Sequence, residues 1–273
     1  MRISGNATVC IPAHNEAETI GCVVSLLQQR LVARGIVREI LVVDDRSSDG
    51  TGDVARRAGA RVIEAETWCS IHGGSIGKGD AIWASISACR TDLIGWLDGD
   101  VSSFDVGRLA ALFDVLNDDT AVQLVKGAFD RRDEDGQVTE GRLTALTARP
   151  LLSLFYPEIA QLREPLGGIF AMRRSVAEEL SLDPDYGVDI GIVIDIVETY
   201  GPESVVEIPV GYLSHKSRPL DDLKGSAEMV SRAIVLRALG DRGVRGSESD
   251  VWGMNARRFP VSWFRRTDLA EVG

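Results

Sequence analysis

The chain has 273 residues, 44% of them hydrophobic and 6% aromatic, so it is long and apolar enough to bury a sizeable core in one large or two small domains. Its 30 lysines and arginines against 41 aspartates and glutamates give a formal net charge of −11. This balance argues against a nucleic-acid partner and against a polybasic membrane anchor. An anionic substrate therefore requires a local cationic patch or a metal ion.

The cysteines and the hydropathy pattern predict a soluble protein of the reducing cytoplasm. The four cysteines show no CxxC spacing, which favours free thiols over a disulfide framework or a zinc site. The N-terminal residues lack a charged flank followed by a long apolar run, and no stretch of about 18 apolar residues occurs. We therefore expect neither a signal peptide nor a membrane partner.

The first half of the chain alternates short apolar runs with amphipathic helical patterns. The expected strands are residues 7–12, 38–45, 61–65 and 92–98, and the expected helices are residues 16–35, 47–59 and 78–88. Strands that alternate with helices need crossover connections and form a mostly parallel sheet. The sequence thus predicts an α/β fold with a ligand site beyond the carboxyl ends of its strands.

The second half of the chain is less regular. It contains an expected strand at 122–129, a charged loop at 130–141, a helical stretch at 143–162 interrupted by Pro150 and Pro157, a strand at 204–213 and a helix at 220–239. Residues after 240 are rich in Gly, Ser and Arg, which favours a loosely ordered tail. We expect the aromatic residues of that tail to dock it on the body or on a second subunit.

Two aspartates one residue apart end the expected fourth strand, in the stretch LIGWLDGDVSSFD. Ionised carboxylates this close repel each other unless a cation or a shared proton relieves them. With only Gly99 between them, Asp98 and Asp100 are well placed to hold Mg²⁺ or Mn²⁺, which prefer oxygen ligands. The alternative is a solvated turn in which Asp100 caps a helix beginning near Ser102.

Polar residues also end the first two expected strands. They are residues 12–16 after the first strand, and Asp44 and Asp45 at the end of the second. Because the carboxyl ends of parallel strands meet at one edge of a sheet, we expect these side chains to converge with the aspartate pair.

Several separated motifs agree with one family of enzymes. They are IPAHNEAETI, VVDDRSSDGT, GGSIGKGDAIWAS, VTEGRLTALTARPLL, PLGGIFAMRRS, YGVDIGIVIDI and HKSRPL. With the aspartate pair, the first three resemble the nucleotide-sugar-binding half of GT-A glycosyltransferases. The others resemble the glucosyl-3-phosphoglycerate synthase family and its retaining relatives, and the resemblance covers about residues 7–235.

The resemblance implies a GT-A fold, a Rossmann-like and mostly parallel sheet flanked by helices. Residues 1–128 would form the nucleotide-sugar-binding subdomain and residues 129–240 the acceptor-binding subdomain. Residues 241–273 would form a C-terminal tail that docks on the body or contributes to a homodimer.

For the donor, the resemblance implies a site built from the strand ends. Its residues would be Pro12, Ala13, His14, Glu16, Asp45, Lys78 and Asp98. Glu16 has the alternative role of a charge favoured at a helix N-terminus. Turn and capping chemistry is the alternative for Asp44, Asp45 and Asp49, and we favour it for Asp49.

For the metal, the resemblance implies that Asp100 and His215 ligate Mg²⁺ or Mn²⁺, with Asp98 beside them. A lone histidine is more often structural than a ligand, but the adjoining RPL motif favours the ligand. The cation would act as a Lewis acid that neutralises the diphosphate leaving group.

For catalysis, the resemblance implies Asp189 together with Leu166, Gly167 and Gly168 of the PLGG motif. The Asp189 carboxylate would position sugar hydroxyls and counter developing positive charge, and the glycines would let the backbone approach the sugar. The family has Glu where Asp189 stands, and the missing methylene shortens its reach. The alternatives are an N-cap for the following helix at Asp189 and a plain turn at the glycines.

For the acceptor, the resemblance implies Arg149, Lys216 and Ser217, since a guanidinium suits a phosphate or a carboxylate. The family prefers Asn where Ser217 stands. A solvated charge is the alternative for Lys216, and it is the role that we favour for Arg131 and Arg132.

These residues predict a metal-dependent retaining glycosyltransferase that moves a hexose, with glucose favoured, from a UDP-sugar to a small anionic acceptor such as 3-phosphoglycerate. The alternatives are a different small-molecule acceptor in specialised metabolism and a non-catalytic nucleotide-sugar-binding protein, which the departures at Asp189 and Ser217 favour.

Other nucleotide-binding classes fit the sequence less well. A P-loop NTPase is excluded by spacing, because His72 occupies the required glycine position and Gly79 replaces Ser or Thr. A dinucleotide dehydrogenase is excluded because no GxGxxG follows the first strand. A nucleotidyltransferase would require a Gly-rich loop with a basic residue directly after the first strand, but this chain has IPAHNEAE there.

Overall fold

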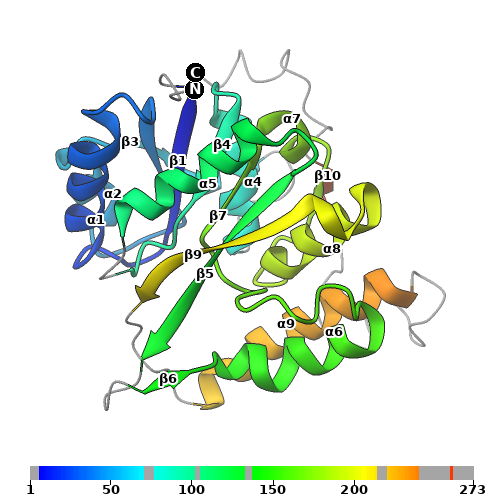
Figure 1. The fold of residues 1–273 in the computed structure, drawn as a ribbon. Coiled ribbons are helices and arrows are strands. Elements are labelled where there is room, and N and C mark those ends of the chain that lie inside the picture. Colours follow the sequence, from blue (N-terminus) through cyan, green and yellow to red (C-terminus); the bar gives the residue numbers. More distant parts are fainter. Residues whose placement is uncertain are drawn as a thin grey trace.

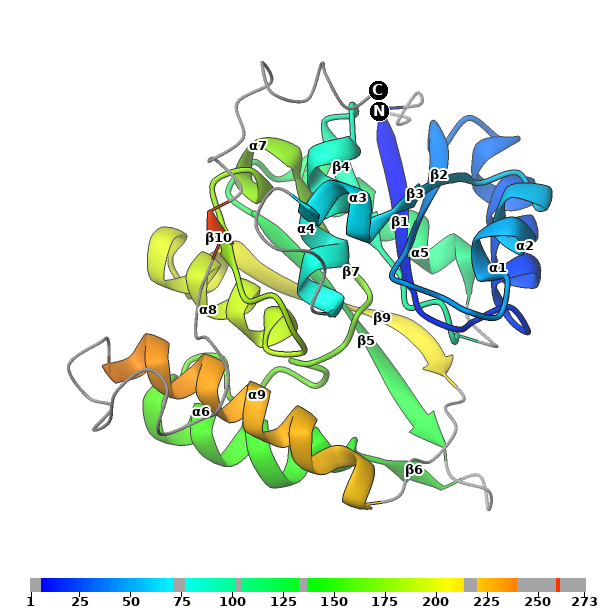
Figure 2. The same ribbon diagram turned by 180° about the vertical axis from the view of Figure 1, so that it is seen from behind.

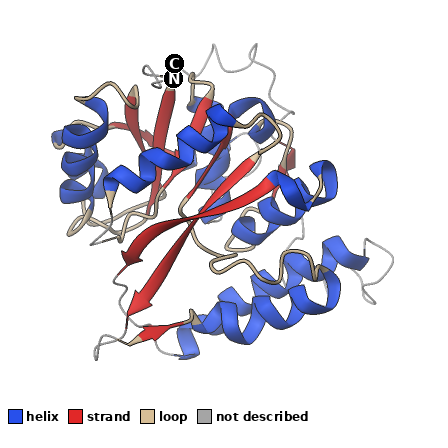
Figure 3. Ribbon diagram, in the orientation of Figure 1, coloured by secondary structure: helices blue, strands red, loops and turns tan. Residues whose placement is uncertain are grey.

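One mixed sheet of eight strands forms the centre of the molecule, with helices on both of its faces (Figures 1 and 3). The computed structural model describes residues 6–70, 77–101, 105–132, 137–213, 220–239 and 259–260. The strand order is β3-β2-β1-β4-β7-β5-β6, and β9 pairs with β5. This layered arrangement confirms the predicted α/β class.

The strands of the sheet are mostly parallel. They are β1 (Ala7–Ala13), β2 (Glu39–Asp44), β3 (Arg61–Glu64), β4 (Leu93–Trp96), β5 (Leu124–Arg132), β6 (Val138–Thr139), β7 (Phe170–Arg173) and β9 (Val205–Leu213). The first four run parallel, β9 runs parallel to β5, and β7 is antiparallel to both of its neighbours, β4 and β5. A second, two-stranded sheet pairs β8 (Ser181–Leu182) with β10 (Phe259–Pro260).

Each predicted helical segment contains a helix, and the structure has further helices that the sequence did not predict. The helices are α1 (Ile20–Leu27) with the π-helical turn η1 (Gln28–Val32), α2 (Thr51–Arg57), α3 (Ala65–Cys69), α4 (Lys78–Ala88), α5 (Val106–Asp118), η3 (Thr144–Ala148) with α6 (Arg149–Phe155), α7 (Arg174–Ala177), α8 (Val188–Tyr200), η4 (Pro202–Ser204) and α9 (Leu220–Leu239). None of those in the described part of the chain is long and apolar enough to cross a membrane.

Three predicted helices have different limits in the structure. The helix expected at 47–59 spans only Thr51–Arg57. The helix expected at 16–35 begins only at Ile20, because Asn15 has a positive φ of 56° and the residues after it form turns. The helical stretch expected at 143–162 ends at Phe155, shortly before Pro157. The helix predicted at 220–239 has those limits in the structure.

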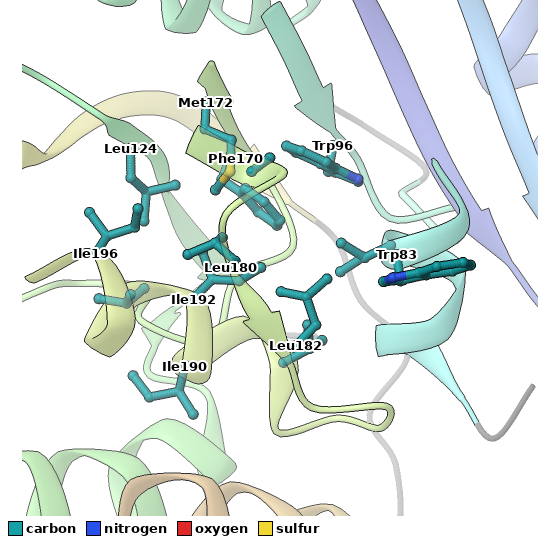
Figure 4. Close-up of a cluster of buried hydrophobic side chains, with 14 of the residues drawn as sticks. Trp83, Trp96, Leu124, Phe170, Met172, Leu180, Leu182, Ile190, Ile192 and Ile196 are labelled. Carbon is teal, nitrogen blue, oxygen red and sulfur yellow. The ribbon is translucent and has the colours of Figure 1, made fainter. Parts of the chain in front are cut away.

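The side chains of the sheet alternate between two hydrophobic layers. Val9 and Ile11 of β1 face the layer formed with α1, α2 and α5, whereas Cys10 faces the layer formed with α4, α8 and α9. In the second layer the rings of Trp96 and Phe170 stack with their centroids 4.7 Å apart (Figure 4). Helices α6 and α9 lie side by side beyond α8, away from the first four strands (Figure 2).

All four cysteines are free thiols, as predicted. Cys10 and Cys89 are both buried, with their sulfur atoms 3.5 Å apart. Burial raises the pKa of the Cys10 thiol well above its usual value, and the neighbouring Cys89 raises it further. This pair therefore behaves as apolar core rather than as a reactive site.

The first turn of α4 lies directly against the loop that precedes α8. A Cβ atom on Gly79 would be 1.8 Å from the carbonyl oxygen of Asp183, so only glycine fits there. The backbone N–H of Asp80 donates to the carbonyl oxygen of Pro184 at 3.2 Å. This close approach brings together the first turns of two helices that are far apart in the sequence.

We expect Gly79→Ala to lower the free energy of unfolding by about 3 kcal/mol, because the added methyl group must displace backbone atoms. The matched variant is Gly225→Ala in the exposed face of α9, where a Cβ atom meets nothing within 4 Å. It should raise the free energy of unfolding by about 0.5–1 kcal/mol through helix propensity. Urea unfolding of both variants measures the difference, and equal stabilities would contradict this packing.

Candidate functional site

The carboxyl ends of β1, β2 and β4 lie together at one edge of the sheet. The backbone N–H of Asp45 donates to the carbonyl oxygen of Ala13 at 2.8 Å, and the N–H of Leu97 donates to that of Cys10 at 3.1 Å. The His14 Nδ1 atom lies 2.5 Å from the carbonyl oxygen of Asp45. The three polar strand ends therefore converge, as the alternating pattern predicted.

Thr19 links the first strand end to the aspartate pair. Its hydroxyl donates to the carbonyl oxygen of Gly99 at 2.9 Å and lies 3.1 Å from Oε2 of Glu16. Glu16 thus lies beside the turn that carries Asp98 and Asp100, and it precedes the first residue of α1. Both roles considered for Glu16, in the site and near a helix N-terminus, are compatible with this position.

Arg46 balances the charge of Asp45 at the second strand end. Asp45 is 6% exposed and accepts hydrogen bonds from Nε and Nη2 of Arg46 at 2.9 and 3.2 Å. The hydrogen bonds that Arg46 donates to Asp45 raise the pKa of Arg46. Arg46 was not among the predicted site residues, although its position directly after two aspartates was a signal in the sequence.

Asp49 has the turn-forming role that we favoured, whereas the N-cap of α2 is Gly50. Its Oδ1 atom accepts from the backbone N–H of Thr51 at 3.0 Å, and its Oδ2 atom accepts from the N–H of Ala17 at 3.0 Å. The Thr51 hydroxyl also donates to Oδ1 of Asp49, at 2.5 Å. This bond has the largest effect, and together with the backbone bonds it lowers the pKa of the Asp49 carboxyl. Asp49 therefore fixes the two loops beside the strand ends relative to each other.

Lys78 lies between two carboxylates that come from distant parts of the chain. Its Nζ atom is 2.9 Å from Oδ1 of Asp98 and 2.9 Å from Oδ2 of Asp189. The Lys78 side chain is 14% exposed and that of Asp189 only 5%. Burial alone would lower the pKa of Lys78, but Asp189 and Asp98 more than offset this and raise it. We call these three residues the Lys78 cluster.

Asp189 lies in the first turn of α8, and only one of its two carboxylate oxygens is hydrogen-bonded to a described residue. The N-cap of α8 is Gly187, so the alternative of Asp189 as the N-cap is wrong. Oδ1 of Asp189 is buried and has no hydrogen-bond partner among the described residues. An unsatisfied buried carboxylate oxygen is costly, and a donor from a bound molecule would relieve that cost.

The PLGG loop packs onto the Lys78 cluster through Gly168. A Cβ atom on Gly168 would be 2.2 Å from Oδ1 of Asp98, so any side chain there would displace the carboxylate. Lys126, which is 1% exposed, donates to the carbonyl oxygens of Gly167 and Pro165 at 2.6 and 3.2 Å. Burial lowers the pKa of Lys126. Its signal in the sequence was a lysine inside an apolar strand.

Arg131 also holds the loop that contains Gly167 and Gly168. Our expectation that Arg131 is a solvated charge is therefore wrong. Its Nε and Nη2 atoms donate to Glu164 at 3.1 and 3.0 Å, and Glu164 is only 3% exposed. Burial raises the pKa of Glu164, although Arg131 opposes the shift. Two basic residues of β5 therefore hold the loop at 164–168 in place.

The predicted acceptor residues are only partly within the described structure. Arg149 begins α6 and donates to Oε1 of Glu140 at 2.6 Å and to the carbonyl oxygens of Ala160 and Leu162 at 2.5 and 3.3 Å. Leu166 packs against the core layer that contains α8. His215, Lys216 and Ser217 lie outside the described residues.

The aspartate pair fits two ligands of a divalent cation. Asp98 is held by Lys78, whereas Asp100 makes no hydrogen bond or ion pair with another described residue. Helix α5 begins at Val106 with Asp105 as its N-cap, so the capping alternative for Asp100 is wrong. The described residues contain no group of three His, Cys, Asp or Glu side chains close enough to hold a metal, and the predicted third ligand, His215, lies outside them.

The mixed α/β sheet, with acidic residues gathered at its strand ends, defines a protein of GT-A architecture. Residues 8–181 match glycosyl transferase family 2, and the chain belongs to this family of glycosyltransferases.

Proteins of known structure or function are similar over most of the chain. Glucosyl-3-phosphoglycerate synthase of Mycolicibacterium smegmatis is 34% identical over 245 residues, which are 87% of this chain and 79% of that protein. The same enzyme from Mycobacterium tuberculosis, in complex with Mn²⁺, UDP-glucose and phosphoglyceric acid, superposes with a TM-score of 0.84 at 30% identity, covering 96% of this chain and 92% of that one. Mannosyl-3-phosphoglycerate synthase of Rubrobacter xylanophilus superposes with a TM-score of 0.80 at 32% identity, covering 95% of this chain and 80% of that one.

We expect Lys78→Met to lower the free energy of unfolding by about 3 kcal/mol, because it leaves the buried Asp189 carboxylate without its cation. Since the pKa of Lys78 is raised above its unfolded value, the stabilisation is present at neutral pH and is lost only as the pH rises through the folded pKa. Urea unfolding at pH 7 measures the loss.

Two further variants control this measurement. Lys78→Met/Asp189→Asn removes the buried charge as well and should recover more than half of the lost stability. Lys224→Met breaks an ion pair with Asp221 that is 75% exposed on the lysine side, and it should change stability by no more than about 0.5 kcal/mol. A Lys78→Met variant as stable as the Lys224→Met variant would contradict the role of the cluster.

Proposed function

We propose that this glycosyltransferase transfers glucose from UDP-glucose to a small anionic acceptor of the phosphoglycerate type, with retention of configuration and with Mg²⁺ or Mn²⁺. The observation that carries the proposal is the Lys78 cluster, which joins the acidic strand end to Asp189 beside the PLGG loop. The complex of the similar enzyme with Mn²⁺, UDP-glucose and phosphoglyceric acid supports the same substrates for this chain.

The nucleotide would bind at the ends of β1 and β2. His14 is oriented by its contact with the Asp45 carbonyl oxygen, and Asp45 is buried beside Arg46. Pro12, Ala13 and Glu16 complete this edge, and they are close to the aspartate pair through Thr19. A planar base and a ribose with two hydroxyl groups suit such a set of backbone and carboxylate groups.

Asp100 and His215 would hold the divalent cation, with Asp98 next to them. Asp100 suits this role because no described side chain neutralises it. A bound cation supplies Lewis-acid stabilisation of the diphosphate leaving group. The ion pair with Lys78 holds the Asp98 carboxylate in place beside the proposed cation site.

Asp189 would orient the donor sugar. Lys78 holds its Oδ2 atom, and Oδ1 remains as an acceptor for a sugar hydroxyl. The Lys78 ammonium keeps the net charge here from becoming strongly negative, while a carboxylate near the anomeric carbon stabilises positive charge that develops there. The backbone of Gly168 lies directly against the Asp98 carboxylate, so the PLGG loop would reach the sugar with backbone atoms rather than with side chains.

The acceptor would bind near Arg149, together with Lys216 and Ser217. Glu140 holds Arg149 at 2.6 Å, and a bound phosphate or carboxylate would compete for the same guanidinium. An acceptor that carries both groups satisfies more of these donors than a neutral alcohol does.

The assembly and location of the protein are also proposals. Leu146 and Leu154 lie eight residues apart along η3 and α6 and are 71% and 75% exposed, which gives a second copy an apolar face to cover. Four free thiols fit the reducing cytoplasm.

Turnover measures the proposed function directly. Purified protein with Mn²⁺, UDP-glucose and 3-phosphoglycerate should release UDP and form a product in which NMR shows the anomeric configuration of the donor. GDP-mannose serves as the competing donor, since one similar structure is a mannosyl-3-phosphoglycerate synthase. Faster transfer from GDP-mannose would overturn the assignment of glucose, and no transfer from any nucleotide sugar would overturn the proposed function.

Chelation of divalent cations should abolish this turnover, and Mn²⁺ should restore it. Asp100→Ala should reduce turnover on the order of 1,000-fold even with excess Mn²⁺, because several kcal/mol of stabilisation of the leaving group is lost. Asp118→Ala, an exposed position at the end of α5, is the control and should retain full activity. An active, metal-independent Asp100→Ala variant would refute the metal site.

Asp189→Asn should lower kcat about 100-fold, because the amide keeps the size of the side chain but removes the charge near the reacting carbon. Its affinity for UDP should stay within about twofold of wild type, since the nucleotide contacts lie at the other strand ends. Steady-state kinetics and calorimetric titration with UDP measure the two effects. A change confined to UDP affinity would place Asp189 in the nucleotide site instead.

A further inference from the structure

Buried ion pairs connect α9 to the loop that precedes α8. Arg232 of α9 donates through Nη2 to Oδ2 of Asp185, and both residues are 4% exposed. One turn later, Arg237 lies 2.7 Å from Oδ2 of Asp183 through Nη1 and 2.7 Å from Oδ1 of Asp195 through Nε. Removing one partner of a buried ion pair leaves an uncompensated charge, so these pairs tie α9 to the loop.

The carboxylate that binds Arg232 also organises the start of α8. Oδ1 of Asp185 accepts from the backbone N–H of Gly187 at 2.8 Å, and the N–H of Val188 donates to the Asp185 carbonyl oxygen at 3.2 Å. Gly187 is the N-cap of α8, and Asp189 follows it by two residues. The orientation of Asp189 therefore depends on a turn that Arg232 anchors.

Helix α9 is in direct contact with this turn. A Cβ atom on Gly187 would be 2.9 Å from Cβ of Ala233 and 3.1 Å from the carbonyl oxygen of Met229. The backbone of α9 thus leaves no space between itself and the first turn of α8. A shift of α9 at Arg232 must displace the turn.

The same loop supports Lys78 from its other side. The N–H of Asp80 donates to the carbonyl oxygen of Pro184, and Gly79 packs on the carbonyl oxygen of Asp183. Lys78 is the first residue of α4, directly before Gly79. Both partners of the 2.9 Å contact between Lys78 and Asp189 are therefore built on residues 183–187.

We propose that Arg232 is a positioning residue: through Asp185 it fixes the first turn of α8 and so holds Asp189 against Lys78 at the donor sugar. Arg232 pairs with Asp185 and touches no member of the Lys78 cluster, so it acts only through the loop. The inference rests on the proposed function in so far as Asp189 faces the sugar. A residue needed only for folding would change stability without a selective change in kcat.

The experiment compares Arg232→Met with Arg174→Met. Arg174 is a matched control because its side chain is 17% exposed, pairs with Glu178 and donates to the Thr91 carbonyl oxygen at 3.0 Å, away from the site. We expect Arg232→Met to lower kcat on the order of 30-fold, since a misplacement of about 1 Å costs this much or more. UDP affinity should stay within about twofold, and Arg174→Met should keep the wild-type kcat.

Hydrogen–deuterium exchange gives a measurement that needs no turnover. In Arg232→Met, the amides of residues 187–191 and 78–81 should exchange faster than in wild type, while in Arg174→Met they should not. Unchanged exchange in these turns would overturn the positioning role. If wild type transfers no sugar but these amides loosen selectively, the proposed function fails and the anchoring by Arg232 stands.

A double variant separates positioning from charge burial, including the case in which Arg232→Met does not fold. Arg232→Met/Asp185→Asn removes both buried charges and keeps an acceptor for the Gly187 N–H. It should regain thermal stability while its kcat stays on the order of 10-fold below wild type. Wild-type kcat in the double variant would show that Arg232 serves only to neutralise Asp185, and that result would overturn the proposal.

Discussion

Lys78 between Asp98 and Asp189 is the interaction on which the rest of the site depends. The Asp189 side chain is 5% exposed and that of Asp98 is 31% exposed, and both reach the same ammonium group only if three separate elements are held in register. Burial opposes the charge of Lys78, and the carboxylates outweigh it. The bridge therefore fixes the distance between the acidic turn after β4 and the first turn of α8.

The fold holds these elements in register because glycines allow neighbouring segments to pack closely. Gly79 allows α4 to lie on the loop before α8, and Gly168 allows the PLGG loop to lie on Asp98. Lys126 and Arg131 then hold the loop from behind with buried hydrogen bonds. Gly79, Lys126 and Arg131 lie in a helix or a strand, and such elements position a site more precisely than loops do.

Hydrophobic periodicity and capping signals predicted most of the fold, but they said little about contacts between residues that are far apart in the sequence. Apolar runs and capping signals predicted the parallel strands, the acidic end of β4 and the full length of α9. They could not reveal that Arg131 pairs with a buried Glu164, or that Lys126 holds two carbonyl groups, because both contacts depend on tertiary packing. The late start of α1 followed from a turn at Asn15 that periodicity does not encode.

Position 189 has aspartate where the resemblance implies glutamate, and this difference changes where the carboxylate lies. A shorter side chain places its carboxylate closer to the α8 backbone, and Lys78 meets it there at 2.9 Å. In the proposed donor site, a sugar hydroxyl would donate to the buried Oδ1 atom, whose position is set by the first turn of α8 rather than by a flexible side chain. Selection among hexoses would therefore depend on which sugar hydroxyl reaches that oxygen, because an unmet buried acceptor costs far more than a missing methylene contact.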